Sequence, residues 1–90
     1  MIKIFIMFFV YVLRSEIDGR FYVGMTNNIL RRLGQHNNGY NRSTKTHRPW
    51  VLFFSESFST RPEARKREVY LKSGIGKEYI KNKWSGSSVG

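Results

Sequence analysis

An acidic residue, Glu68, lies inside the most basic stretch of the chain, EARKREVYLK (residues 63–72). The sequence holds 16 lysines and arginines against 6 aspartates and glutamates, so this carboxylate subtracts from the positive charge around it. At about 100° of helical turn per residue, Glu68 shares a face with Ala64 and Leu71, which are its expected core contacts. A carboxylate on the buried side of a basic helix is a candidate for chemistry.

Two interpretations of Glu68 stay open at this point. In the first, it only pairs with Lys72 four residues later, which stabilises an exposed helix by about 0.3–0.5 kcal/mol. In the second, Arg65, Arg67 and Lys72 surround this one acid on the side that faces the body of the protein, and Glu68 binds a hard divalent cation while its basic neighbours attract phosphates. One carboxylate can hold Mg²⁺ when waters and substrate phosphates complete its shell.

A second group of polar side chains lies on the helix predicted over ILRRLGQHN (residues 29–37). Ile29, Arg32, Leu33 and His36 follow the i, i+3, i+4, i+7 spacing of one helical face. This spacing aims an arginine and a histidine at the sheet together with the aliphatic residues. The alternative is that Arg32 and His36 lie at the edge of the apolar stripe with their heads in water.

Two tyrosines supply the third candidate group. Side chains alternate along a strand, so Tyr11 shares a face with its neighbours two positions away, and Tyr22 shares a face with Gly24. If both tyrosines lie on the same face of a hairpin, their hydroxyls come close together. The alternative is that each is an ordinary buried strand tyrosine.

These groups must be positioned by a small α/β fold. Asp18-Gly19 is a hairpin turn dipeptide, Asn27 and Asn28 can cap the first helix, and Thr60-Arg61-Pro62 resembles the start of a second. The predicted elements are strands at Phe5–Arg14, Arg20–Thr26 and 50–58, helices at 29–37, from about 60 to 73, and at Lys77–Trp84, and a polar basic loop at 40–49. The order is strand, strand, helix, strand, helix, helix, with one domain over residues 1–84 and a flexible tail over 85–90.

Composition indicates the partner. A formal net charge of +10 predicts a polyanion, nucleic acid before a membrane surface. The apolar N-terminal segment is too short to span a bilayer and is expected to form a strand, and Met7 is a second possible start. Cysteine is absent, which excludes disulfides and thiolate metal sites and is compatible with the cytoplasm.

Four segments in order, FVYVLRS, FYVGMT, NNILRRLGQH and EARKREVYLK, resemble the GIY-YIG nuclease family, in particular its small stand-alone members and the N-terminal nuclease domain of excinuclease C. In the resemblance, Tyr11 ends the first tripeptide and Tyr22-Val23-Gly24 forms the second. Arg32 and His36 match the arginine and histidine of the family's first helix, and Glu68 matches its metal-binding glutamate. The first tripeptide, Phe9-Val10-Tyr11, departs from the pattern because it lacks the glycine.

The resemblance implies a three-stranded antiparallel sheet flanked by helices and an endonuclease that hydrolyses DNA phosphodiester bonds in repair or processing. It implies a divalent metal, Mg²⁺ or Mn²⁺, on Glu68, and no small-molecule cofactor. One tyrosine, with Tyr11 favoured, would help take a proton from the attacking water. Tyr22 and His36 would position water or assist, Arg32 would stabilise phosphate charge, and Asn82 is a further candidate.

Basic side chains outside this set are expected to contact phosphates, which position a substrate without selecting a sequence. They are Arg31, Arg42, Lys45, Arg48, Arg61, Arg65, Lys66 and Lys72. The competing hypothesis is a binding module for nucleic acid on the same fold, without catalysis.

Overall fold

The computed structural model describes residues 6–86 and is built on a three-stranded antiparallel sheet in the order β2-β1-β3. The strands are β1 (Phe8–Ser15), β2 (Phe21–Thr26) and β3 (Trp50–Phe58). Gly19 in the β1–β2 hairpin has a φ of 75°, as its predicted place in the turn requires. The predicted strand start at Phe5 lies outside the described residues, and within them the strand begins three residues later than predicted.

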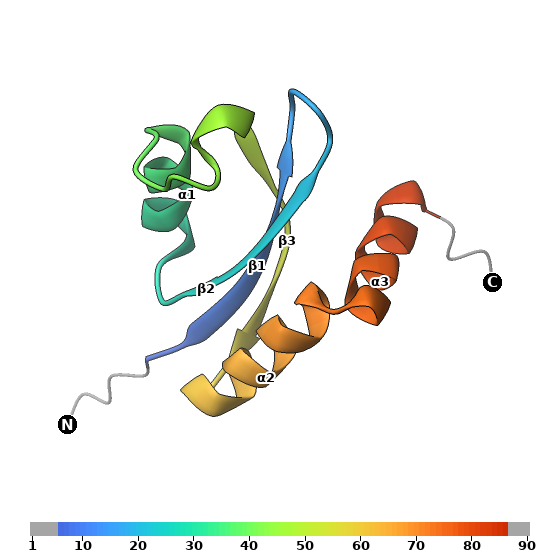
Figure 1. The fold of residues 1–90 in the computed structure, drawn as a ribbon. Coiled ribbons are helices and arrows are strands. Elements are labelled where there is room, and N and C mark those ends of the chain that lie inside the picture. The colour runs from blue at the N-terminus through green and yellow to red at the C-terminus, as the bar shows by residue number, and fades with distance from the viewer. Residues whose placement is uncertain (1–5, 87–90) are drawn as a thin grey trace.

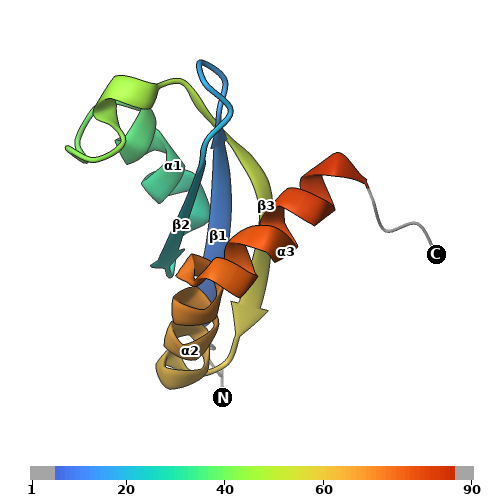
Figure 2. The same ribbon diagram turned by 45° about the vertical axis from the view of Figure 1, so that its right-hand side comes forward.

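Helices cover both faces of this sheet (Figures 1 and 2). Helix α1 (Ile29–Asn37) lies against one face, and α2 (Arg61–Lys72) and α3 (Gly74–Ser85) lie against the other. The order β-β-α-β-α-α is the predicted one. Within the described residues, no helix is long and apolar enough to cross a membrane.

Alternation along β1 divides the core into two parts. Val10 and Val12 pack with Leu71 and Ile80 beneath α2 and α3. Tyr11 and Leu13 point the opposite way and pack with Trp50 and partly buried side chains on the α1 side. The period of two therefore places the polar hydroxyl of Tyr11 on the face that α1 covers.

An irregularity in the sheet lies between β1 and β3. The pairing shifts between Val12, opposite Phe54, and Leu13, opposite Leu52, so Phe53 is an extra residue on β3. Because of this bulge, both Phe53 and Phe54 pack against the core beneath α2 and α3. The bulge thus enriches that face in aromatic rings.

The junction between α2 and α3 is tighter than the sequence predicts. Helix α3 begins at Gly74 instead of Lys77, and only Ser73 separates the two helices. The hydroxyl of Ser73 caps α3 by accepting the backbone N–H of Gly76 at 3.2 Å. A Cβ on Gly76 would stand 2.1 Å from the carbonyl oxygen of Tyr70, so only glycine allows this close packing.

The basic loop after α1 also has internal order. It contains a single 3₁₀ turn, Lys45–His47, which the sequence pattern did not predict. The Asn37 amide at the end of α1 donates to the carbonyl of Trp50 at 3.0 Å and accepts from the Trp50 N–H at 2.7 Å. The two ends of the loop are thereby held together beside the sheet.

Candidate active site

Tyr11 lies at the centre of the candidate site. It pairs with Gly24 across β1 and β2, and its side chain is 2% exposed. A Cβ built on Gly24 would stand 2.3 Å from the Tyr11 hydroxyl and 2.4 Å from Cζ. The phenol therefore lies across the glycine of the edge strand β2, and any larger residue there would displace it.

The Tyr11 hydroxyl belongs to a buried hydrogen-bonded chain. It lies 2.9 Å from Nε2 of His36, whose Nδ1 lies 2.8 Å from the hydroxyl of Thr44, which in turn donates to the carbonyl of Asn41 at 3.3 Å. With the Thr44 proton directed to that carbonyl, the hydrogen-bond network assigns the proton of the neutral His36 ring to Nδ1, which donates to Thr44. Nε2 then accepts, and Tyr11 donates its proton to the imidazole.

Burial keeps both ends of this bond neutral. Burial raises the pKa of Tyr11 to about 12, an increase that the nearby Arg32 guanidinium only partly offsets. Burial and then the positive charge of Arg32 lower the pKa of His36 to about 4. At neutral pH the pair is thus a phenol donating to a neutral imidazole.

Tyr22 lies on the same face of the sheet, two residues along β2 from Gly24 and opposite Leu13. Its ring centroid lies 6.3 Å from that of Tyr11 and 4.8 Å from that of His36. The two tyrosines thus share a face and approach one histidine, as their alternation predicts. Unlike Tyr11, Tyr22 is only half-buried, so part of it is accessible from outside.

Arg32 and His36 take different positions on the same helical face. His36 is fully buried, so its ring does not lie at a solvated edge. Arg32 is half-buried and donates to the side-chain oxygen of Gln35 at 2.9 Å. Its charge acts on the pKa values of both Tyr11 and His36, which places the guanidinium beside the hydrogen-bonded chain.

Glu68 reaches the site from the opposite face of the sheet. Its side chain is 9% exposed, and Ala64 and Leu71 on the same face of α2 are buried with it. Helix α2 packs against β1 and β2, and the Glu68 charge raises the pKa of Tyr11 further. The carboxylate thus acts on the phenol from the other side of the sheet.

Both carboxylate oxygens of Glu68 already have partners. Arg65 donates to Oε1 at 2.7 Å, and the Lys72 ammonium lies 3.1 Å from Oε2. Burial alone would raise the pKa of Glu68, but the hydrogen bonds from Arg65 and Lys72 outweigh it and the pKa is lowered. The expectation that Arg67 also surrounds this acid is wrong, because Arg67 binds Glu56 on β3 at 2.7 and 3.1 Å.

A metal at this position would have Glu68 as its one anionic protein ligand. Among the described residues, no group of three or more histidine, cysteine, aspartate or glutamate side chains is arranged to hold a metal. An ionised carboxylate fits a hard cation that keeps waters and takes phosphate oxygens. Arg65 and Lys72 would have to release the carboxylate, and both side chains are about half exposed or more.

The predicted phosphate-contacting residues fall on two sides of the sheet. Arg31, Arg42, Lys45 and Arg48 lie on α1 and the loop after it, whereas Arg61, Arg65, Lys66 and Lys72 lie on α2. Most are exposed, while Arg48 is half-buried and donates to the Lys45 carbonyl at 2.8 Å. Asn82 lies on α3, on the opposite face of the sheet from Tyr11 and His36.

Comparison with known proteins agrees with this arrangement. The sequence profile of the GIY-YIG catalytic domain matches residues 7–82. The chain belongs to the GIY-YIG family. The GIY-YIG domain thus spans all three strands and most of α3.

Relatives of this GIY-YIG chain are small proteins. It is 40% identical over 79 residues to the UPF0213 protein YazA of Bacillus subtilis, covering 83% of this chain and 79% of that protein. It is 36% identical over 74 residues to a UPF0213 protein of Staphylococcus haemolyticus, covering 81% and 89%. The solution NMR structure of UPF0213 protein BH0048 from Bacillus halodurans superposes with a TM-score of 0.51 at 30% identity, covering 82% and 81%.

Sequence reasoning missed one member of this GIY-YIG site, Thr44. The residue is fully buried, and its hydroxyl lies 2.8 Å from Nδ1 of His36. Its carbonyl accepts the indole N–H of Trp50 at 2.9 Å, which holds the loop in place. Thr44 lies in a loop without periodicity, so no signal in the sequence pointed to it.

Proposed function

We propose that this GIY-YIG protein is a metal-dependent endonuclease that hydrolyses phosphodiester bonds in DNA. The observation that carries the proposal is the hydrogen bond from the buried Tyr11 hydroxyl to neutral His36, with Arg32 alongside. The net charge of +10 supports a nucleic-acid substrate. The resemblance to the nuclease domain of excinuclease C supports a place in DNA repair or processing.

In the proposed reaction, Tyr11 passes a proton onward as it accepts one. A water oxygen attacks the phosphorus, and the water proton moves to the Tyr11 oxygen while the Tyr11 proton moves to Nε2 of His36. The bond from phosphorus to the leaving oxygen breaks, and that oxygen takes its proton from solvent. The tyrosine stays neutral throughout, which suits a phenol whose pKa is about 12.

Two neighbours make the transfer to His36 feasible. Thr44 accepts from Nδ1 and keeps Nε2 turned toward Tyr11 as the ring becomes positive. A bound phosphate adds negative charge beside the ring and raises the pKa of His36 above its value of about 4 in the free protein. Arg32 is placed to donate to the phosphate oxygens as charge develops on them.

Glu68 would hold the divalent cation, Mg²⁺ or Mn²⁺. When bound, such a cation stabilises negative charge on phosphate and leaving-group oxygens. Glu68 is suited to this because its lowered pKa keeps it ionised at neutral pH. Arg65 and Lys72 would then turn from the carboxylate toward the phosphates that they are expected to contact.

The test is nicking of supercoiled plasmid DNA in Mg²⁺ by the wild type and Glu68→Gln. The variant keeps the shape of the side chain and removes its charge, so nicking should be lost. DNA affinity measured without metal should stay level or rise. Glu78→Gln on α3, which removes one exposed acid of the same type, is the matched control and should nick normally.

The second candidate, a non-catalytic module that binds nucleic acid, is favoured by one observation. Both oxygens of Glu68 are engaged by Arg65 and Lys72, as a purely structural ion pair would be. This function predicts DNA binding without nicking in either Mg²⁺ or Mn²⁺. Nicking that persists in Glu68→Gln would instead contradict the assignment of Glu68 as the metal ligand.

A further inference from the structure

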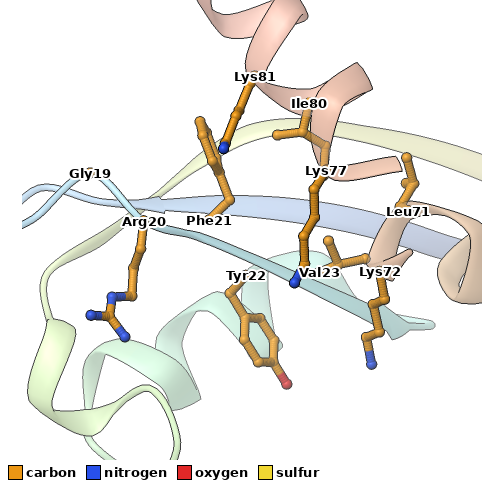
Figure 3. A pocket seen from close by; sticks show the side chains of 10 residues that line it. All are labelled: Gly19, Arg20, Phe21, Tyr22, Val23, Leu71, Lys72, Lys77, Ile80 and Lys81. Carbon is orange, nitrogen blue, oxygen red and sulfur yellow. The ribbon is translucent and has the colours of Figure 1, made fainter. Parts of the chain in front are cut away.

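A groove of about 520 Å³ lies between β2 and the α2–α3 pair, next to the candidate active site (Figure 3). Its lining includes four apolar side chains, Phe21, Val23, Leu71 and Ile80. The groove therefore offers an apolar surface to a ligand that can displace water from it.

The polar lining of this groove is entirely cationic apart from Tyr22. Arg20, Lys72, Lys77 and Lys81 contribute to it, and no acidic side chain does. Figure 3 shows Lys77 and Lys81 extending from α3 toward β2. Within residues 6–86, neither lysine forms an ion pair, so their charge is available to an anionic ligand.

An apolar surface edged by cations fits one form of nucleic acid best. A duplex stacks its bases inside and presents phosphates outward, so it would leave the apolar lining unfilled. An unpaired strand presents both parts, since its phosphates meet cations while its bases pack on aromatic and apolar side chains. Phe21 supplies an aromatic ring to the lining.

The groove borders the candidate active site at the edge strand β2. Tyr22 of that strand is part of the lining, but its ring points to the α1 side of the sheet, where its centroid lies 4.8 Å from that of His36. Lys72 lines it and also pairs with Glu68 at 3.1 Å. A strand held in the groove would therefore pass close to Glu68, the proposed metal ligand.

We propose that this groove binds an unpaired segment of DNA beside the scissile bond, so that the preferred substrate contains a single strand. The statement about the preferred substrate rests on the proposed nuclease function. The binding of a single strand in the groove does not depend on that function. It assigns Lys77 and Lys81 to the phosphates of that strand and Phe21 to its bases.

The test compares binding of a fluorescently labelled single-stranded DNA with binding of the same sequence as a blunt duplex, without divalent cation. The variants are Lys77→Gln, Lys81→Gln and the double substitution. Lys83→Gln is the matched control, because Lys83 lies two residues from Lys81 but over the ring of Phe54, 5.1 Å from its centroid, and does not line the groove. All three substituted positions are exposed, and circular dichroism checks that each of the four variants is folded.

Each phosphate of a single strand that a cation neutralises contributes about −0.7 to the slope of log affinity against log salt concentration. Relative to 1 M salt, this contribution amounts to about fivefold in affinity at 0.1 M salt. Each single substitution should therefore weaken single-strand binding about fivefold, and the double about 25-fold. The loss on duplex should not exceed that of Lys83→Gln. A deoxyribose-phosphate oligomer without bases should bind the wild type at least about fivefold more weakly than the single strand.

Three results would overturn the proposal. Equal losses on single strand and duplex would reduce the groove to a general phosphate contact. Unchanged single-strand affinity in the double variant would remove it from the binding surface, and equal affinity for the abasic oligomer would mean that only charge is recognised. None of these results depends on cleavage, so a protein that passes this test but never nicks DNA contradicts only the nuclease function.

Discussion

Replacing Gly24 with alanine should dislodge the Tyr11 ring. The new Cβ would stand 2.3 Å from the Tyr11 hydroxyl, 2.4 Å from Cζ and 2.9 Å from Cε1. Gly24 is not among the glycines with positive φ, so its backbone suits alanine and the conflict is purely steric. The hydroxyl must move by 3.4 − 2.3 = 1.1 Å to reach an ordinary contact distance. A movement away from His36 stretches the 2.9 Å bond to about 4 Å, beyond hydrogen-bonding range.

The cost follows from three contributions. Overpacking costs about 1–3 kcal/mol, and loss of the buried hydrogen bond adds about 0.5–1.5 kcal/mol. The lower chain entropy of unfolded alanine offsets about 0.4–1 kcal/mol. The net loss of about 2 kcal/mol should lower the melting temperature by roughly 8–16 °C in a domain of this size. Plasmid nicking should fall with it, because Tyr11 leaves the site.

Urea and thermal unfolding followed by circular dichroism measure this loss, and a double-mutant cycle identifies its cause. Tyr11→Leu removes all three clashing atoms, so adding Gly24→Ala to it should be neutral or slightly stabilising. Gly34→Ala on α1 is the control, because a Cβ there meets nothing within 4 Å and should stabilise the helix by up to about 1 kcal/mol. The reasoning is refuted if Gly24→Ala costs the same with leucine at position 11 as with tyrosine.

Three further predictions concern the neighbours of Tyr11. Burial lowers the pKa of His36 to about 4 from its ordinary 6.5, so the unfolded chain binds more protons than the folded one between these pH values. The free energy of unfolding should therefore fall as the pH drops from 6.5 to 4. Urea titrations of His36→Gln should show a shallower fall, and an unchanged slope would contradict the assignment. Thr44→Val leaves the His36 Nδ1–H without an acceptor and should lower the free energy of unfolding by about 1–3 kcal/mol in the same titrations. Thr44→Ser should stay near wild type, and equal stability of the two variants would contradict the chain of hydrogen bonds. Arg32→Lys keeps the charge but not the two-pronged donor and should lose most plasmid nicking while remaining folded; normal nicking would return Arg32 to a solvated edge of α1.

The periodicity of strands and helices predicted the positions of several residues of the candidate site. Alternation placed Tyr11 and Tyr22 on one face, and helical spacing turned His36 inward, because each depends on a repeat that the backbone enforces. Burial of Glu68 with Ala64 and Leu71 followed in the same way. Contacts of this kind are local, so they can be read without knowledge of the rest of the fold.

Contacts between distant segments could not be predicted in this way. Thr44 reaches His36 only because Asn37 and Trp50 join the ends of a loop without regular structure. Arg67 donates to Glu56 on β3, which is eleven residues away in the sequence, and not to Glu68, which is adjacent in the sequence. Such pairings depend on how elements pack, which no spacing within one element records.

The start of α3 was misplaced for a related reason. Gly74 and Gly76 lower helix propensity, so the sequence pattern alone does not indicate a helix over them. In the fold they lie in the first turn of α3, where Gly76 is needed because its neighbour is the α2 backbone. A glycine that lowers helix propensity can thus be required by the packing of that same helix.

The single residue between α2 and α3 would have a consequence for the products of the proposed cleavage. Ser73 ends one helix and caps the next, and Gly76 presses against the backbone of α2. Glu68 on α2 and the groove lysines on α3 are therefore held at a constant separation. If the groove binds an unpaired strand and Glu68 lies at the point of cleavage, this junction sets the distance between the bound nucleotides and the cleaved bond. Fragments would be released at one fixed offset from the gripped nucleotides, and lengthening the connection at Ser73 would be the way to change it.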